Sequence, residues 1–339
     1  MKIATVKDVA RVAGVSPATV SRVVTNKGNT TEEIKKRVLE AMEELKYVPN
    51  INAQSLSSNR SRTICFSIAR NPKEILGNSF FSDVLCGISD AAKLQDYNLQ
   101  FALFHTIEEQ MEKCVKLYRQ KQVDGFIFTS IRSSDKDILL KGLKAKHIPF
   151  VMIGSSLSHS ALSIHNDNVR DSYISTKYLV DKGYRRILFL TPSLKQDVIY
   201  DRIHGYQRAI EESGLDLSPE YIVYCGDEED EVTQALEQVE KEGISFDSII
   251  TMESIMSLSA LKYCQAKGKK VPEDVGILCF NNAPYLDKVS PSISCIDLNP
   301  ILLGNEAFKL LLDLIEQPSS SFVNKSITLP SQIIERQST

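Results

Sequence analysis

The stretch that most constrains this chain is residues 5–26, TVKDVARVAGVSPATVSRVVTN, which predicts two short helices joined by a tight turn. Thr5 can cap the first helix, with Asp8 three residues on as an acidic variant of the capping box, and a glycine supplies the stop. Ser16 caps the second helix, and Pro17 occupies its first position, where a missing N–H costs nothing. Valine and alanine at helical spacing give each helix one apolar face.

The outer face of the second helix is small and polar. Short side chains permit close approach to a DNA major groove, hydroxyls reach phosphates, and Arg22 can hold a guanine edge with two hydrogen bonds. The predicted DNA contacts in this stretch are Thr5, Ser16, Pro17, Ala18, Thr19, Ser21, Arg22 and Asn26. Spacing alone leaves open a plain three-helix module with a polar outer face.

The string DVARVAGVSPATVSRV favours the DNA-binding interpretation. It closely resembles the N-terminal signature of the lactose-repressor-like (LacI) family of bacterial transcription regulators. The resemblance implies a small all-α helix-turn-helix head, followed by an α/β body of two periplasmic-binding-protein-like parallel-sheet subdomains. It also implies a homodimer that binds pseudo-palindromic double-stranded operator DNA under the control of a small-molecule effector. Asn29, Tyr47 and Asn50 are further predicted DNA contacts that follow the helix pair.

Length, composition and charge fit this class of protein. At 339 residues the chain suits two or three domains. It has no run of about 18 apolar residues, and its N-terminus lacks the apolar core of a signal peptide, so we expect a cytoplasmic protein without membrane contact. Seven scattered cysteines predict neither a disulfide framework nor a metal site. The net charge is −3, yet residues 1–62 hold 11 Lys and Arg against 6 Asp and Glu, which suits contact with phosphates.

A third helix and a linker follow the helix pair. The third helix ends before Pro49, so the predicted helix-turn-helix domain is residues 1–48. Residues 49–62 are polar and could form only a helix too short to persist alone in water, so they are the predicted hinge helix and linker. In the resembled family this segment lies in the minor groove, where Leu56 would wedge between base steps and Ala53 would permit close approach. A plain linker is the alternative.

From residue 63 onwards, short apolar runs alternate with amphipathic helical stretches. Continuously apolar strands with helices between them indicate parallel sheets covered on both faces, and the units are too many for one sheet. The family resemblance implies a ligand-binding and dimerisation domain at 63–339, with an N-subdomain and a C-subdomain. The predicted ranges are about 63–164 and 295–322 for the N-subdomain, and about 165–292 and 323–339 for the C-subdomain. The three crossings are expected near Ile164–Asn168, Pro291–Asp297 and Ser320–Ile327.

Polar residues just after strands are the candidates for binding a ligand in the cleft between two such halves. Asp167 could accept two sugar hydroxyls, or it could cap the helix that follows. Arg202 lies in DRIHGYQRA, which resembles the family pattern R-x-x-G-[YFW] whose arginine reaches the ligand; an exposed, idle arginine is the alternative. Asn281 stands where the family more often has Asp, and it keeps hydroxyl recognition while adding donors.

Three further residues complete the predicted ligand site. Phe80 and Phe81 match the family's N-P-[FY]-F, and an aromatic ring here could stack on a sugar or base, or pack in the core. Glu253 follows a strand where the family tends to have Asn. These groups suit a polyhydroxylated molecule with an apolar face. The strings SIHNDN, FNN and LPSQIIE resemble maltose-operon regulators of Gram-positive bacteria, which implies maltose or a related sugar; a purine or other non-sugar effector is the alternative.

Two other classes of protein share parts of this pattern. The five histidines are dispersed, and no nucleophile–base motif or phosphate-cradling glycine loop occurs, so we expect neither an enzyme nor a cofactor. A solute-binding protein for transport has the same two-lobed body, but the basic head argues against it. The sequence therefore predicts a DNA-binding repressor of a carbohydrate-utilisation operon, controlled by a sugar in the cleft.

Overall fold

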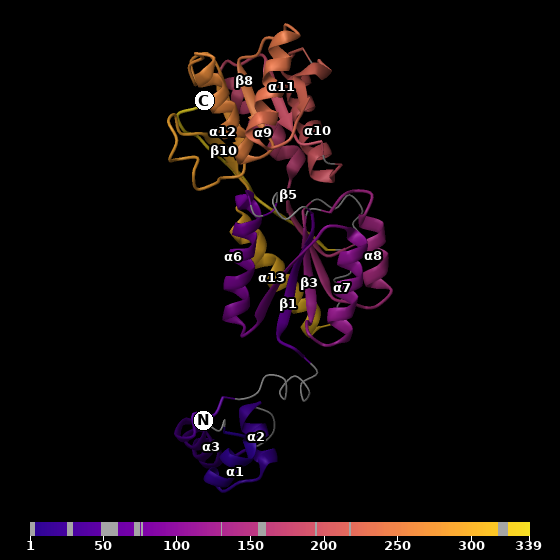
Figure 1. Cartoon of the computed structure of the whole chain (residues 1–339), viewed down its shortest axis with the longest axis vertical. Helices are drawn as coiled ribbons and strands as arrows, with labels where there is room; N and C mark the ends of the chain where they lie inside the picture. Colours follow the sequence, from indigo (N-terminus) through magenta and orange to yellow (C-terminus); the bar gives the residue numbers. More distant parts are fainter. Residues whose placement is uncertain are drawn as a thin grey trace. The chain divides into compact units, whose positions relative to one another are not determined.

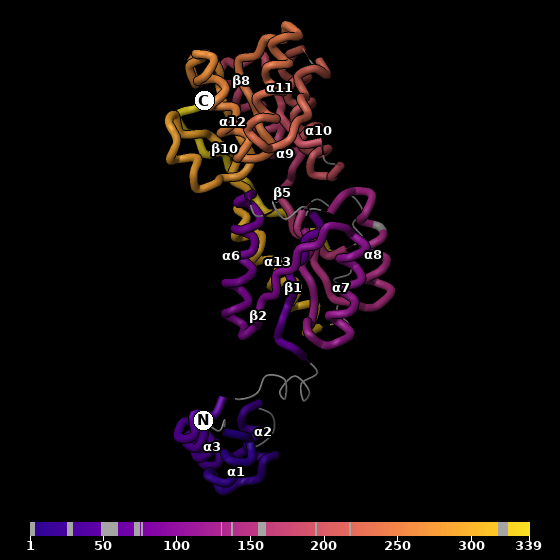
Figure 2. The backbone as a smooth tube through the Cα atoms, viewed as in Figure 1, coloured from indigo at the N-terminus to yellow at the C-terminus, as the bar shows by residue number. Residues whose placement is uncertain are grey.

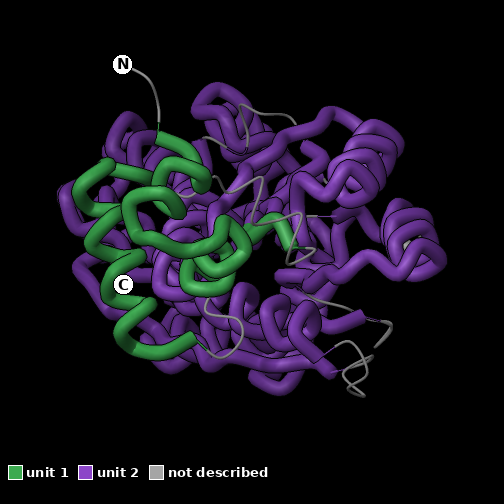
Figure 3. Tube along the Cα trace, turned by 90° about the horizontal axis from the view of Figure 1, so that it is seen from below, with its two compact units in different colours: residues 1–62 green, residues 63–339 purple. Residues whose placement is uncertain are grey.

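The computed structural model describes residues 4–25, 30–48, 60–70, 75, 77–129, 131–154, 161–193, 195–216, 218–317 and 325–339. The chain divides into two compact units, Met1–Arg62 and Thr63–Thr339, which Figure 3 distinguishes by colour. None of the described helices is both long enough and apolar enough to cross a membrane.

Three helices form the first unit, which we call the head: α1 (Val6–Ala13), α2 (Pro17–Val24) and α3 (Glu32–Glu44). Before α1, the Thr5 hydroxyl donates to Asp8 Oδ2 at 2.7 Å, and the Thr5 backbone N–H donates to the same oxygen at 3.0 Å. Gly14 then takes a left-handed conformation with φ 64°, which a glycine adopts without strain. The Ser16 hydroxyl accepts from the backbone N–H of Thr19 at 3.1 Å. Local capping therefore places the turn between α1 and α2.

The core of the head is built mainly from valine and alanine. Val9, Val20 and Val38, one from each helix, are completely buried. Arg37 of α3 donates to the Ala13 carbonyl at 2.8 Å and so ties α3 to the end of α1. With so little apolar area, the head depends on these caps and cross-links as well as on burial.

The second unit, the body, contains two six-stranded sheets, and we call each sheet with its helices the N-lobe and the C-lobe. The N-lobe sheet has the order β11-β5-β4-β3-β1-β2, and all its neighbouring strands are parallel. Its strands are β1 (Thr63–Ala69), β2 (Asn98–Phe104), β3 (Gly125–Thr129), β4 (Phe150–Ile153), β5 (Ser163–Asn166) and β11 (Ser326–Leu329). Its helices are α6 (Ser79–Leu94), α7 (Ile107–Arg119), α8 (Lys136–Lys144) and α13 (Pro300–Glu316).

The N-lobe sheet is covered on both faces (Figure 1). In β1, Ile64, Phe66 and Ile68 pack in one cluster with α6 and α13, whereas Cys65 packs in the other with α7 and α8. This alternation follows from the twofold repeat of a strand. The segment β1 is therefore apolar throughout because both of its faces are buried.

The C-lobe repeats the arrangement with the order β12-β10-β9-β8-β6-β7, in which only β12 runs antiparallel to its neighbour. Its strands are β6 (Ile187–Thr191), β7 (Ile222–Tyr224), β8 (Ser248–Thr251), β9 (Gly276–Phe280), β10 (Ser294–Asp297) and β12 (Gln332–Ile334). Its helices are α9 (Asn168–Asp181), α10 (Asp197–Glu212), α11 (Glu229–Lys241), α12 (Ser254–Ala266) and the 3₁₀ turn η1 (Pro219–Tyr221). Figure 2 follows the backbone through both lobes.

The chain passes between the lobes three times, and two of the predicted boundaries require correction. The first passage lies between β5 and α9, at Asn166–Asn168. Strand β10 still pairs with β9, so the second passage follows at Leu298–Asn299, later than the predicted start of the N-subdomain segment at 295. Strand β11 pairs with β5, so the third passage lies at Pro330–Ser331 and not near 320–327. A short strand can pair with the free edge of either sheet. The residues of β10 and β11 alone therefore do not specify which lobe each strand joins.

Glycines set the closest helix contacts in both lobes. A Cβ at Gly87 of α6 would lie 1.9 Å from the carbonyl oxygen of Ile301 in α13. A Cβ at Gly205 of α10 would lie 2.0 Å from the carbonyl oxygen of Val169 in α9. No side chain fits these distances, so the glycine of the R-x-x-G motif serves helix packing and fixes the position of α10 beside α9.

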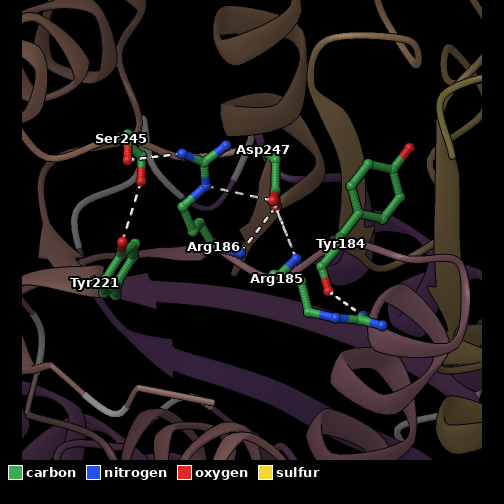
Figure 4. Close-up of polar contacts among 6 residues, drawn as sticks. All are labelled: Tyr184, Arg185, Arg186, Tyr221, Ser245 and Asp247. Carbon is green, nitrogen blue, oxygen red and sulfur yellow. Dashed lines mark hydrogen bonds and ion pairs between the residues drawn. The ribbon is translucent and has the colours of Figure 1, made fainter.

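Asp247 ties the beginnings of two C-lobe strands together (Figure 4). Its carboxylate accepts the backbone N–H of Arg185 at 3.1 Å and that of Arg186 at 2.9 Å, just before β6. The Arg186 side chain returns to Asp247 Oδ2 at 3.6 Å and donates to the Ser245 hydroxyl at 2.9 Å, while Tyr221 donates to the Ser245 carbonyl at 3.1 Å. The Asp247 carboxylate thus accepts two backbone N–H groups that lie just before β6 and outside the hydrogen-bonded strand pairing.

We expect Asp247→Ala to destabilise the body by about 1–3 kcal/mol, because two backbone N–H groups lose a charged acceptor. Urea unfolding monitored by circular dichroism measures the change. Asp287→Ala is the matched control, since Asp287 is exposed and forms its ion pair with the neighbouring Lys288. Equal midpoints for the two variants would contradict the assigned role of Asp247.

Candidate functional site

The outer face of α2 is available for contact with a partner. Thr19 is half-buried, and the hydroxyls of Ser16 and Thr19 are 2.9 Å apart. The exposed predicted contacts are Thr5, Ser16, Pro17, Ala18, Ser21 and Arg22. Tyr47 is half-buried and packs against the head core. Asn26, Asn29, Asn50, Ala53 and Leu56 lie outside the described residues.

A cavity of about 860 Å³, part of it open to solvent, lies between the two lobes of the body. Its apolar lining includes Phe80 and Phe81 at the start of α6, whose ring centroids are 5.4 Å apart in an edge-to-face arrangement. Phe81 is buried in the N-lobe core, whereas half-buried Phe80 packs against the cores of both lobes. Both roles considered from the sequence are thus compatible with their positions.

Arg202 is buried at the cavity rather than exposed. Its Nε donates to Asn168 Oδ1 at 3.1 Å and its Nη1 donates to the Met252 carbonyl at 3.3 Å. The guanidinium carbon lies 3.9 Å from the centroid of the Phe280 ring, within the range of a cation–π contact. Burial lowers the pKa of Arg202 to about 10, with opposing contributions from Glu253, Asp171 and Asp201, so the group stays cationic at neutral pH.

Two polar contacts at the N-terminus of α6 join the lobes across the cavity. Asn78 Nδ2 donates to Glu253 Oε2 at 2.7 Å, and Asn281 Nδ2 donates to the Ser79 hydroxyl at 3.3 Å. Burial raises the pKa of Glu253, while Arg70, Arg202 and the Asn78 hydrogen bond act in the opposite direction. The cavity therefore contains an acid whose charge depends on its cationic neighbours.

A third contact joins the lobes on the side of α8. Asp197, the first residue of α10, accepts from the Ser133 hydroxyl at 2.5 Å and forms a buried ion pair with Lys136. The backbone N–H of Ser133 also donates to the Lys195 carbonyl at 3.0 Å. Lys136 and Asp197 both line the cavity, so a ligand would meet this pair already neutralised.

Asn281 offers the cavity an acceptor that the described residues leave unpaired. The residue is 2 % exposed, and its Oδ1 has no hydrogen-bond partner among them. Its φ of 72° is left-handed, a conformation that asparagine tolerates better than most residues. A buried acceptor of this kind costs free energy until a donor satisfies it. A hydroxyl of a bound ligand would supply that donor.

Comparison with known proteins identifies the family of the head and that of the body. Residues 5–50 match the model for bacterial regulatory proteins of the lacI family, and residues 176–339 match the model for a periplasmic binding protein-like domain. The chain is 34% identical over 316 residues to the HTH-type transcriptional regulator MalR of Streptococcus pneumoniae, covering 92% of both proteins. The chain belongs to the LacI family. It is accordingly a DNA-binding transcriptional regulator and not an enzyme.

Solved structures of similar fold cover both the head and the body. The Lac repressor bound to ONPG in its repressed state superimposes with a TM-score of 0.84 over 100% of both chains, at 22% identity. The complex of the transcriptional regulator CelR with cellobiose gives 0.75 over 99% of this chain and 100% of that one, at 23% identity. The LacI-family architecture of a helix-turn-helix head and a two-lobed α/β body is therefore present here.

Within this LacI-family body, one predicted ligand contact is not at the cavity. Asp167 is exposed, lies outside the cavity lining, and accepts the backbone N–H of Arg170 at 3.0 Å as the cap of α9. The helix-capping alternative therefore describes its position. Its backbone lies in the first passage between the lobes, and its carboxylate is hydrogen-bonded at the N-terminus of α9. The predicted residues that do line the cavity are Phe80, Phe81, Arg202, Glu253 and Asn281.

The sequence analysis missed polar residues that share this cavity. Arg70 follows β1, Asn78 caps α6 by accepting the Phe80 N–H at 3.0 Å, and Asp197 begins α10. Each lies beyond the carboxyl end of a strand or at the start of a helix, which is the signal that could have found them. Lys136 comes from α8, and only the tertiary structure brings it to Asp197. Among the described residues, no three His, Cys, Asp or Glu side chains gather into a metal site.

Asn166 joins the three passages between the lobes. Its Nδ2 donates to the Leu298 carbonyl of the second passage at 3.1 Å and to the Leu329 carbonyl beside the third at 3.2 Å. Asn168 Nδ2 donates to the Asn166 carbonyl at 3.3 Å, and Asn168 Oδ1 accepts from Arg202. A continuous line of hydrogen bonds therefore runs from Arg202 at the cavity to the three passages between the lobes.

We expect Asn166→Ala to destabilise the body by about 1–3 kcal/mol, because a buried and a partly buried carbonyl lose this donor. Chemical denaturation of the body measures this loss. Asn98→Ala provides the control, since Asn98 is exposed at the start of the edge strand β2. A loss no larger than that of the control would show that the Asn166 amide does not hold the passages together.

Proposed function

We propose that this LacI-family regulator is a homodimeric, cytoplasmic repressor whose affinity for operator DNA is controlled by a neutral sugar, maltose or a related disaccharide, in the cavity between its lobes. The observation that carries the effector proposal is the lining of the cavity. Aromatic rings from α6 face the same space as Arg202, Glu253 and the unpaired Asn281 Oδ1. Apolar walls combined with several fixed hydrogen-bonding groups suit a polyhydroxylated ring.

Similar proteins support a sugar of this size. The structurally similar CelR binds the disaccharide cellobiose, and a probable maltose operon transcriptional repressor, malR of Staphylococcus areus, is among the proteins with this fold. Among neutral sugars we therefore favour a disaccharide.

The head supplies the DNA side of the proposal. Exposed Arg22 lies in the last turn of α2, beside small neighbours that permit close approach to base edges. The predicted contacts of the hinge, including the Leu56 wedge, remain predictions. A single head this small offers few base contacts, so recognition of two half-sites by two copies would multiply specificity.

A second copy of the chain would also cover apolar surface of the N-lobe. Leu94 at the end of α6 is 80% exposed and Ile301 at the start of α13 is 50% exposed. Leu99, Phe101 and Leu103 of the edge strand β2 are only half-buried. Burial of such groups favours association, which supports an N-lobe dimer interface in this proposal.

Control of DNA binding by the sugar then requires two arrangements of the lobes. The effector contacts both lobes and competes for groups that now join them, such as Asn78 and Asn281. It can shift DNA affinity only by its different affinity for the two arrangements. The line from Arg202 through Asn168 to Asn166 connects these contacts to the passages around which the lobes move.

We expect maltose or a related disaccharide at millimolar concentration to raise the melting temperature of the full chain and to change operator affinity at least about fivefold. Differential scanning fluorimetry against neutral sugars and purine bases measures the first effect. Fluorescence anisotropy on an operator selected from random DNA measures the second. Stabilisation by a purine base but by no sugar would overturn the sugar effector and leave the DNA-binding role standing.

We expect Arg22→Ala to weaken operator binding by about 1–3 kcal/mol and to relax base choice at one position of each half-site. Binding to random DNA should fall much less, because that binding depends on total charge. Arg11→Ala is the matched control: Arg11 is also exposed in the head but pairs with Asp8 on α1. Equal losses for both variants on operator and random DNA would remove Arg22 from base recognition.

A further inference from the structure

Glu253 is the carboxyl group of the cavity lining that lies outside the Lys136–Asp197 ion pair. Arg70, Arg202 and the Asn78 hydrogen bond favour its ionised form, whereas burial opposes it. Glu253 lies at the N-terminus of α12, lines the cavity, and is bound to Asn78 of the opposite lobe at 2.7 Å. Arg70 and Arg202 line the same cavity, and both interact electrostatically with Glu253. The remaining charges of the lining, Lys136 and Asp197, form an ion pair with each other.

Two arginines line the cavity beside Glu253. Arg202 is buried between Asn168, the Met252 carbonyl and the Phe280 ring, so it cannot leave the site without breaking these contacts. Arg70 follows β1 and is half-buried at the cavity wall. Two guanidinium groups facing one cavity form a site that attracts carboxylates and phosphates unless a fixed anion lies between them.

We propose that Glu253 determines the charge selectivity of this cavity: its carboxylate offsets Arg70 and Arg202, so the site accepts neutral polyhydroxylated effectors and rejects anionic sugars such as aldonates and sugar phosphates. This inference rests on the sugar effector proposed above and extends it to the excluded competitors. Rejection by a fixed like charge discriminates more strongly than the loss of one neutral contact. The same carboxylate accepts hydroxyl donors, so one group serves both recognition and exclusion.

Two aspects of the geometry separate this role from a purely structural one. The Glu253 side chain gives no capping hydrogen bond to α12, so the helix does not depend on its charge. Its contact with Asn78 requires only an acceptor oxygen, which an amide also provides. The substitution Glu253→Gln therefore removes the charge while keeping the shape and the contact between the lobes.

The test compares the full-length chain with its Glu253→Gln variant at about pH 8, where the carboxylate is more fully ionised. Isothermal titration with maltose and with maltobionate, its carboxylate counterpart, gives the ratio of the two dissociation constants. We expect the variant to shift this ratio roughly tenfold or more towards maltobionate. A ratio unchanged between the two proteins would overturn the proposal.

A second measurement keeps the inference separate from the proposed function. Inorganic phosphate, compared with chloride at matched ionic strength, should raise the melting temperature of Glu253→Gln more than that of the unchanged chain, since phosphate also stabilises folded proteins generally. This result would support the charge role of Glu253 even if neither sugar bound. Equal responses of both proteins to phosphate would overturn it, whatever the sugars do.

Two controls locate the effect. Glu211→Gln removes the same charge from an exposed position on α10 and should leave both readouts unchanged. Adding Arg70→Gln to Glu253→Gln should reverse the gain in phosphate response, because one of the two attracting cations is then lost. A phosphate response that survived this second substitution would place the anion elsewhere and overturn the assignment. If Glu253→Gln does not fold, Glu253→Asn provides the same comparison.

Discussion

The two lobes of this regulator depend on one amide. Asn166 donates to carbonyls of both other passages while its own backbone forms the first, so three segments far apart in sequence meet at a single side chain. Buried backbone carbonyls need hydrogen-bond donors. Where the chain passes from one sheet to the other, the regular strand pairing ends, and the Asn166 side chain supplies donors there. This arrangement lets the three passages move together, because Asn166 belongs to the first and is hydrogen-bonded to the other two.

Close backbone packing makes the lobes rigid on either side of these passages. Gly87 and Gly205 remove the side chain at the points where α6 meets α13 and α10 meets α9. Parallel sheets covered on both faces leave little freedom within each lobe. A ligand between the lobes can therefore change the position of one lobe relative to the other more readily than it changes either interior. Control of a separate DNA-binding head requires such a change.

The candidate ligand site shows where sequence reasoning reached its limit. The positions of Glu253 and Asn281 followed from their places after strands, because parallel strands direct their carboxyl ends to one edge. Arg202 was found through the R-x-x-G motif, and it lies inside α10 and not at its start. Asp167 satisfied the same rule, yet its carboxylate caps α9. A capping role and a ligand role use the same residue types, so only the direction of the side chain separates them.

The sequence by itself determined the three-helix head, the alternation of strands and helices, and the class of regulator, because caps, periodicity and the motif DVARVAGVSPATVSRV are local properties. The tertiary structure alone decided that β11 joins the N-lobe and β12 the C-lobe. It also decided that Lys136 meets Asp197 and that Asn78 meets Glu253. Partners across a cleft are set by the packing of whole lobes, and no single stretch of chain contains that information.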